Sequence, residues 1–311
     1  MTERPQFASL QEYVARTGDA AYWWPYLAEI LQRHDLIDSG IEPEAGYNPT
    51  NPTFVYGDVV VKLFGHYPWW RASHAAEWAA QDLIATDPDI VAPKLVGGGH
   101  LYDDVDAPWP YLITTRMNGV ALRDAELSDE ELLSVAAQLG DQMQRTHALR
   151  PSDRLPQSRR PGEDTALAAE RSSLPAHLVA QVNDYVARLG PFDSVFVHGD
   201  LIAAHAFVDD GQLVGIIDWG DAVVTDRHYE LIQVYRDMFA CDKAQFRVFL
   251  EAAGWPVDED FANRALGLAL HRQAVGLTQH HTIDVFMPIA ARFPLKDVDT
   301  LEELATLLFS V

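Results

Sequence analysis

Two aspartates and a histidine in the second half of the chain have types and spacing suited to moving a phosphoryl group. Residues 197–205 have the sequence VHGDLIAAH, so His205 follows Asp200 by five positions, and Asp218 comes thirteen positions later. Phosphoryl transfer needs one carboxylate that orients the attacking hydroxyl and two side chains that hold Mg²⁺ on the phosphates. These three residues, on a loop between short apolar runs, are candidates for those roles.

The same spacing occurs in the signature of protein kinases, H-R-D-L-x-x-x-N followed by D-F-G. Asp200 takes the position of the catalytic aspartate, His205 that of the asparagine and Asp218 that of the D-F-G aspartate. The loop has H-G-D in place of H-R-D, and no Ala-Pro-Glu segment follows, which argues against a protein kinase. We expect His198 to hold the loop, because a carboxylate already fills the role of base.

Residues upstream could complete such a site. Lys62 lies in the apolar run 59–63 (VVVKL), which is typical of a β-strand, and its ammonium suits the α- and β-phosphates of a nucleotide. Glu77 comes fifteen positions later on a predicted helix, where it could hold that ammonium; the alternative is a solvated helix glutamate. Residues 116–119 (RMNG) suit a hinge whose backbone faces an adenine.

A small sheet is predicted to carry the upstream residues. Apolar spacing and turn residues indicate a helix at 22–31, a hairpin of 53–56 and 59–64 around Gly57-Asp58, a helix at 70–85, and strands at 94–96 and 111–115. We interpret residues 1–117 as a nucleotide-binding lobe with leading helices.

A helical body is predicted to carry the catalytic loop. Ser128 and Glu131 form a capping box before a helix that ends near His147, and helical patterns resume at 164–189. The remaining elements are strands at 194–197 and 213–217, which flank a polar loop, and four or so helices from Asp226 onward. The predicted fold class is α+β and bilobal, of the protein-kinase type, with residues 118–311 as the helical C-terminal lobe.

Composition narrows the function further. The chain of 311 residues has 23 Lys+Arg against 46 Asp+Glu, a net charge of −23, whereas nucleic-acid and anionic-membrane partners call for basic surfaces. The acidic excess favours a cationic partner or serves solubility alone. One cysteine, Cys241, and an N-terminus without a signal-peptide core predict a cytoplasmic protein. The sequence leaves the oligomeric state open.

Several stretches together resemble the aminoglycoside phosphotransferase family, and within it most closely the hygromycin B phosphotransferases of the 7″-hydroxyl type. They are spread through nearly the whole chain: Thr50-Asn51-Pro52, 61–65 (VKLFG), 109–112 (WPYL), 116–119 (RMNG), 198–201 (HGDL) and 301–304 (LEEL). The resemblance implies the bilobal protein-kinase-like fold, ATP or GTP as phosphoryl donor, and Mg²⁺.

The resemblance also implies a role for each matching residue. Asp200 would be the catalytic base, and His205 and Asp218 the metal ligands. Lys62 would bind the phosphates with Glu77 as its brace. The backbones of two further residues, Thr115 and Met117, would contact the adenine.

His205 is a departure from the aminoglycoside pattern, which usually has asparagine there, and it resembles the macrolide phosphotransferases. Imidazole suits Mn²⁺ better than Mg²⁺, which prefers oxygen ligands. We therefore expect activity to persist with Mn²⁺ and to fall below about pH 6 as His205 is protonated.

The acceptor site is expected in the helical lobe, facing Asp200, with four acidic residues as candidates: Asp221, Asp226, Glu230 and Asp237. Asp226 has the alternative role of a helix N-cap. Glu230 and Asp237 are seven apart, hence on one face of a regular helix, where they could meet ammonium groups or form a solvated surface.

Three other patterns are set aside. The glycines at 97–99 lack the G-K-[ST] ending of a phosphate loop and are expected to connect strands. The histidines at 271, 280 and 281 have no pair at i, i+4, so solvated or core positions are expected instead of a zinc site. The aromatic residues Tyr67, Trp69 and Trp70 are expected to pack under the sheet.

The function predicted first is O-phosphorylation of a small, cationic antibiotic, an aminoglycoside such as hygromycin B. Phosphorylation of a macrolide or an endogenous metabolite by the same fold is the alternative. A non-catalytic nucleotide-binding module is the alternative of another class, and the presence of Asp200, Asp218 and Lys62 together argues against it.

Overall fold

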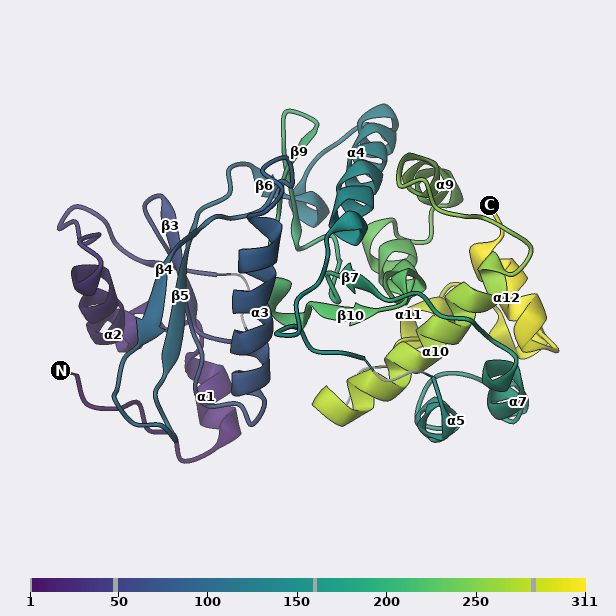
Figure 1. The fold of residues 1–311 in the computed structure, drawn as a ribbon, viewed down its shortest axis with the longest axis horizontal. Coiled ribbons are helices and arrows are strands. Elements are labelled where there is room, and N and C mark those ends of the chain that lie inside the picture. Colours follow the sequence, from purple (N-terminus) through teal and green to yellow (C-terminus); the bar gives the residue numbers. More distant parts are fainter. Residues whose placement is uncertain (1, 47–49, 159–160, 281–283) are drawn as a thin grey trace.

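The computed structural model describes residues 2–46, 50–158, 161–280 and 284–311. Figure 1 shows an antiparallel sheet flanked by helices on one side of the molecule and a larger, mostly helical body on the other. Among the described helices, none combines the length and the apolar composition that a membrane span requires. The fold class predicted from the sequence is confirmed.

The N-terminal sheet is antiparallel, in the order β1-β2-β3-β5-β4. Its strands are β1 (Glu44–Ala45), β2 (Thr53–Tyr56), β3 (Val59–Leu63), β4 (Leu95–His100) and β5 (Pro110–Thr115). The predicted hairpin is present: β2 pairs with β3 across a turn in which Gly57 has φ +58°, a left-handed conformation that favours glycine. β3 lies between two partners, which fixes the position of Lys62 in the sheet.

Three consecutive glycines lie inside β4, not in a connection, so that prediction was wrong. A Cβ at Gly97 would lie 2.7 Å from the His34 ring, and one at Gly98 would lie 2.5 Å from Trp78. The aromatic side chains that cover this strand therefore leave no room for larger residues. The observed strand runs from Leu95 to His100 and is therefore longer than the strand predicted at 94–96.

Three helices pack around the sheet: α1 (Leu10–Arg16), α2 (Ala20–Arg33) and α3 (Trp70–Ile84). The predicted apolar stripe of α2, from Trp23 to Leu31, is buried in one cluster with Phe54 and Val61 of the sheet. Tyr67 packs against this cluster and stacks on Trp69, with ring centroids 4.6 Å apart, as expected for a packing role.

The C-terminal body contains the long helix α4 (Asp129–Ala148), which begins with the predicted capping box. The Glu131 amide donates to Ser128 Oγ at 3.3 Å, and Glu131 Oε2 accepts from the Ser128 amide at 2.8 Å. The helical pattern at 164–189 is divided into α5 (Glu163–Ala169), α6 (Ala176–Val179) and α7 (Val182–Ala187). Pro175, directly before α6, cannot donate a helical hydrogen bond and helps to separate the segments.

Two small sheets carry the predicted catalytic loop. One pairs β7 (Val195–Val197) with β10 (Val223–Thr225), and the other has the order β6 (Val120–Ala121), β8 (Ala206–Asp209), β9 (Gln212–Ile216). The sequence predicted β7 and β9 but treated β8 as polar loop. The chain passes from the N-terminal sheet to these strands between Thr115 and Val120; a domain boundary at residue 117 stays a prediction.

The remaining helices are α8 (Leu231–Gln233), α9 (Lys243–Ala252), α10 (Phe261–His280), α11 (Met287–Ala290) and α12 (Leu301–Phe309). A π-helical turn (Val234–Met238) follows α8 directly. A second apolar cluster fills this body and includes Ala79, Ala80 and Ile84 of α3, so α3 joins the sheet to the body. Figure 1 shows α3 between the two parts.

Candidate active site

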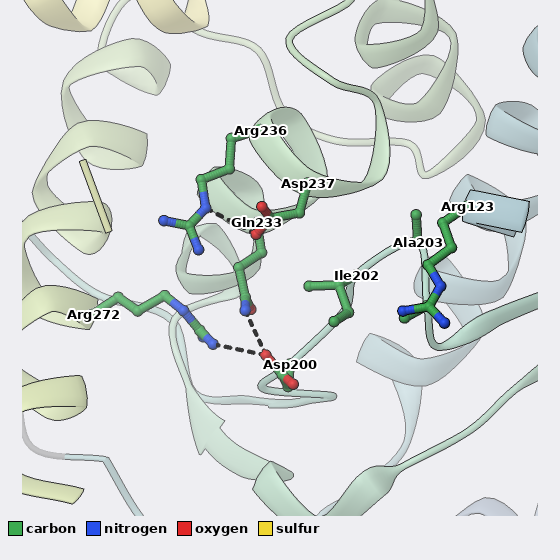
Figure 2. Close-up of a pocket in the computed structure, with 9 residues that line it drawn as sticks. Arg123, Asp200, Ile202, Ala203, Gln233, Arg236, Asp237 and Arg272 are labelled. Carbon is green, nitrogen blue, oxygen red and sulfur yellow. Dashed lines mark hydrogen bonds and ion pairs between the residues drawn. The ribbon is translucent and has the colours of Figure 1, made fainter. Parts of the chain in front are cut away.

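The carboxylate of Asp200 is held at one oxygen. Its Oδ1 accepts a hydrogen bond from Gln233 Nε2 at 2.5 Å, and Arg272 Nη2 lies 3.5 Å from the same atom (Figure 2). The other oxygen, Oδ2, lies 3.6 Å from His205 Nδ1. Asp200 is thus a fixed carboxylate with Oδ2 as its less engaged oxygen.

His198 shapes the loop before Asp200. Its Nε2 donates to the Ile217 carbonyl at 2.9 Å, and its Nδ1 accepts from the Asp200 amide at 3.2 Å, so both ring nitrogens are used in a neutral ring. Burial lowers the pKa of His198, which agrees with that state. Gly199 has φ +84°, and a Cβ there would lie 2.0 Å from the Asp221 carbonyl oxygen. The structure supports a structural role for His198.

Glu230 does not face an acceptor site, so that part of the sequence prediction was wrong. It is 1% exposed, and its Oε1 accepts from the amides of His198 at 2.6 Å and Gly199 at 3.3 Å. Its Oε2 lies 2.9 Å from His147 Nε2. Burial alone would raise the pKa of Glu230, but these hydrogen bonds outweigh it and hold the pKa below its usual range. Glu230 therefore fixes the backbone of the catalytic loop through buried hydrogen bonds.

We expect Glu230→Gln to reduce the free energy of unfolding by about 3 kcal/mol at pH 7, because it breaks a buried charged network. The native pKa of Glu230 is depressed, so its contribution is present above the unfolded value of about 4.3 and is lost as the pH falls through the native pKa. Urea unfolding at several pH values measures this. The difference in unfolding free energy between the wild type and Glu230→Gln should become smaller below about pH 4.3. Glu251→Gln, at an exposed position, should have the unfolding free energy of the wild type at every pH. If the difference in unfolding free energy is the same at pH 7 and at the lowest pH tested, the stabilising group is not the ionised carboxylate of Glu230.

Lys62 connects the sheet to the catalytic body. Its Nζ lies 2.8 Å from Glu77 Oε2 and 2.7 Å from Asp218 Oδ1. The prediction that Glu77 lies beside Lys62 is confirmed, because α3 packs on the 3₁₀ turn Trp219–Asp221 and against β5, the strand next to β3. Asp218 itself has φ +62°, an uncommon conformation for a residue other than glycine and one often found at functional sites.

Lys62 and Asp218 stabilise each other's charge. Burial would lower the pKa of Lys62, but Asp218 and Glu77 outweigh it and raise the pKa above its usual range. Burial would raise the pKa of Asp218, but Lys62 holds it well below its usual range. Burial does raise the pKa of Glu77, against the opposing effect of Lys62. Lys62 and Asp218 are therefore charged at neutral pH.

His205 presents one ring nitrogen toward Asp218. Its Nδ1 lies 2.8 Å from the Asp200 carbonyl oxygen, which can only accept, so Nδ1 carries the proton in the neutral ring. The Nε2 lone pair is then available, 3.6 Å from Asp218 Oδ2. An imidazole nitrogen and a carboxylate oxygen facing each other fit a divalent cation. No set of three metal-ligating side chains occurs among the described residues.

Asp221 lies next to these groups, as its position predicted. Partial desolvation at this position and the negative charges of Asp200 and Asp218 raise the pKa of Asp221. Its side chain is exposed to solvent. Contact between Asp221 and an acceptor stays a prediction.

Asp226 is an N-cap, the alternative that the sequence left open, and is 2% exposed. Its carboxylate accepts from the His228 amide at 2.9 Å and the Asp193 amide at 2.8 Å, so the prediction of an acceptor contact was wrong. Asp237 does line a cavity beside Asp200, but its Oδ2 is paired with Arg236 Nε at 2.8 Å.

The regular helix that would place Glu230 and Asp237 on one face is absent from this segment. A 3₁₀ turn (Arg227–Glu230), the short α8 and the π-helical turn follow one another, so spacing by 3.6 residues does not hold. Glu230 therefore points into the core while Asp237 reaches the cavity.

The Thr115 amide donates to the Lys94 carbonyl at 2.9 Å, so strand pairing already uses that donor. An adenine contact through this residue would have to use its carbonyl group. Met117 follows the end of β5, and its side chain packs against Gly215 of β9. Adenine contacts of Thr115 and Met117 stay predictions.

A cavity of about 390 Å³ opens beside Asp200 in the helical body (Figure 2). It is lined by residues from the 3₁₀ turn Leu122–Asp124, the catalytic loop, α8, the π-helical turn and α10: Arg123, Asp200, Ile202, Ala203, Ala204, Gln233, Arg236, Asp237 and Arg272. Because Asp200 lines this cavity, it is the candidate acceptor site.

Residues 42–266 match the sequence pattern of the phosphotransferase enzyme family, APH. The chain belongs to this family. It is therefore an enzyme, and the strand lysine, the buried glutamate and the loop aspartates described above all lie within the matched region of this phosphotransferase.

Solved structures share the fold of the phosphotransferase over most of its length. An aminoglycoside phosphotransferase of the APH(2″) type, in complex with GDP and kanamycin, is 20% identical over 91% of this chain and 99% of its own, with a TM-score of 0.65. The macrolide 2′-phosphotransferase of Brachybacterium faecium is 20% identical over 83% and 93%, with a TM-score of 0.59. A mutant aminoglycoside phosphotransferase of the APH(4) type, with AMP-PNP and hygromycin B, is 17% identical over 81% and 88%, with a TM-score of 0.55.

Sequence reasoning missed several residues of the phosphotransferase that converge on Asp200 and the cavity. Gln233 and Arg236 come shortly before Asp237 in the sequence, and Arg272 lies thirty-five residues after Asp237, on α10. Of the three histidines set aside, His271 is buried and lies 3.0 Å from Ser158 Oγ. His281 lies outside the described residues, and the structure does not describe the side chain of His280.

Proposed function

We propose that this phosphotransferase moves the γ-phosphoryl group of ATP or GTP to a hydroxyl of a small molecule. The observation that carries the proposal is the chain of close contacts from Lys62 and Glu77 to Asp218 and on to Asp200, with His205 between the two aspartates. Complexes of the structural neighbours with GDP and with AMP-PNP support a nucleotide as donor.

Asp200 acts on the acceptor. Its Oδ2 orients the acceptor hydroxyl and takes its proton as the acceptor oxygen bonds to the γ-phosphorus and the β–γ bridging bond breaks. Gln233 and Arg272 fix Oδ1, so Oδ2 is held toward the hydroxyl. Lys62, positioned by Glu77, binds the phosphates that remain on the nucleoside diphosphate.

His205 and Asp218 are the residues that would hold a divalent cation, through Nε2 and Oδ2. When bound there, Mg²⁺ or Mn²⁺ supplies positive charge that neutralises the phosphates. Imidazole nitrogen is a better ligand for Mn²⁺ than for Mg²⁺, so we expect both cations to support activity.

We expect His205→Ala to weaken Mn²⁺ binding at least about tenfold, because it removes a ligand on which the affinity depends. Calorimetric titration of Mn²⁺ into the enzyme with ADP present measures this directly. His205→Asn, which restores the side chain of the kinase signature, should keep Mg²⁺-supported activity. Unchanged Mn²⁺ affinity together with unchanged Mg²⁺-dependent activity in His205→Ala contradicts the ligand role.

The acceptor class was predicted first as an aminoglycoside such as hygromycin B. Neighbours that bind kanamycin and hygromycin B support an antibiotic, and His205 and the macrolide 2′-phosphotransferase neighbour favour the macrolide alternative. Cells that express the chain should resist at least one compound in a screen of aminoglycosides and macrolides. Resistance to none, with no phosphorylated antibiotic formed by the purified enzyme, excludes the antibiotic and favours a metabolite.

A further inference from the structure

The Lys62 ammonium contacts the carboxylate through which the proposed function holds a divalent cation. Its Nζ lies 2.7 Å from Asp218 Oδ1, close to the 2.8 Å that separates it from Glu77 Oε2. The side chains of Lys62 and Glu77 are 14% and 8% exposed, so solvent screens these charges only weakly. Lys62 is therefore shared between two carboxylates at nearly equal distance.

A divalent cation bound at Asp218 would meet this ammonium. The other ligand of the cation site is His205, whose Nε2 lies 3.6 Å from Asp218 Oδ2. Because Oδ1 and Oδ2 belong to one carboxylate, an ammonium on the first and a cation on the second repel each other. The described residues provide no set of three metal-ligating side chains, so the affinity for a cation depends strongly on the negative charge of Asp218. Lys62 neutralises that charge.

The surroundings of Lys62 allow its ammonium to exchange Asp218 for another anion while it stays with Glu77. The lysine backbone is fixed in β3 between β2 and β5, but its side chain is a flexible stem that ends in three rotatable donors. Gly220 lies beside the ammonium, and a Cβ there would be 3.2 Å from Glu77 Oε2 and 3.7 Å from Lys62 Nζ. The glycine therefore leaves space at the point where these charges meet. The phosphates of a nucleotide, which carry several negative charges, are suited to replace the single carboxylate of Asp218.

We propose that Lys62 blocks the cation-binding carboxylate of Asp218 in the enzyme without nucleotide, and that the nucleotide phosphates release Asp218 by binding the ammonium. Nucleotide and divalent cation then bind cooperatively through Lys62, in addition to the affinity of the cation for the phosphates themselves. Because such coupling is reciprocal, each ligand tightens the binding of the other by the same factor. This inference rests on the proposed function, since it concerns the nucleotide and the cation of the same site.

Titration of Mn²⁺ into the enzyme without nucleotide tests this, with free Mn²⁺ measured by electron paramagnetic resonance. We expect Lys62→Met to bind Mn²⁺ at least about fivefold more tightly than the wild type, because Asp218 is then unblocked. Lys62→Met/Glu77→Leu should show the same gain. The double variant removes one positive and one negative charge, so a change in net charge does not explain its gain, and it leaves no buried Glu77 without a partner.

Two further variants show where the additional affinity arises. Adding His205→Ala to the double variant should abolish the gain, because Mn²⁺ then lacks its imidazole ligand. Lys94→Met, which removes a lysine at an exposed position, should bind Mn²⁺ with the affinity of the wild type. The inference is overturned if Lys62→Met/Glu77→Leu binds Mn²⁺ no more tightly than the wild type, or if its gain persists after His205→Ala.

Failure of this inference is distinguishable from failure of the proposed function. If the double variant gains no Mn²⁺ affinity while the wild type phosphorylates an acceptor, the blocking of Asp218 by Lys62 is wrong and phosphoryl transfer stands. If the double variant gains Mn²⁺ affinity as expected but the wild type transfers no phosphoryl group to any acceptor tested, the proposed transfer to a small molecule is wrong and the cooperative binding of nucleotide and cation stands.

Discussion

Replacing Asp200 by asparagine lowers kcat by about 10²- to 10⁴-fold, the usual contribution of a positioned general base. Asparagine keeps an oxygen for Gln233 and Arg272 at the Oδ1 position, so the local structure is expected to persist. The amide that replaces Oδ2 cannot take the acceptor proton. Steady-state kinetics with saturating nucleotide and acceptor measure the effect.

The KM values for nucleotide and acceptor should change by less than about threefold, because Asp200 acts in the chemical step and contributes little to ground-state binding. Asp209→Asn, at an exposed position of β8, is the matched control and should leave kcat unchanged. A kcat in Asp200→Asn within a few-fold of the wild-type value would show that another group accepts the proton.

Replacing Lys62 by methionine has the second largest expected effect and acts on activity and stability together. Loss of the ammonium removes a charged donor from the phosphates, which should lower kcat/KM for the nucleotide by about 10²- to 10³-fold. It also leaves Glu77, 6% exposed, without the partner 2.8 Å away. Breaking a buried ion pair in this way costs about 3–5 kcal/mol of unfolding free energy.

The double variant Lys62→Met/Glu77→Leu separates the two effects. Replacing both partners of a buried ion pair by apolar side chains often leaves the free energy of unfolding unchanged. The unfolding free energy of the double variant should therefore return to within about 1–2 kcal/mol of the wild-type value. Activity should stay as low as in Lys62→Met, because the phosphate ligand is still missing. Urea unfolding and nucleotide kinetics on the same preparations decide the outcome. Recovery of activity with stability would mean that Lys62 is only structural.

The sequence predicted those parts of the site that depend on short-range patterns. Lys62 was placed correctly because two short apolar runs around a Gly-Asp turn indicate a hairpin. Glu77 was placed beside it because a regular helix of known start converts spacing into position. The loop of Asp200, His205 and Asp218 was found from spacing alone, since the chemistry requires those residue types in that order.

The positions of the residues that surround Asp200 depend on tertiary packing, and no short-range sequence pattern indicated them. Glu230 was predicted to contact an acceptor or to lie on a solvated surface, yet it is buried, because the His198 and Gly199 amides and the His147 ring converge on it. The π-helical turn after Gln233 changes which side chains reach the cavity, and no local pattern indicated it. Arg272 reaches Asp200 from α10.

The central claim is that this chain transfers a γ-phosphoryl group to an acceptor hydroxyl through Asp200. The most direct measurement follows γ-³²P from labelled ATP and GTP into a panel of cationic, neutral and acidic polyhydroxylated acceptors, with wild type and Asp200→Asn side by side. The account predicts label on at least one acceptor, carried by oxygen, with wild type and almost none with Asp200→Asn. Label released only as inorganic phosphate, or transferred equally by both proteins, would contradict it.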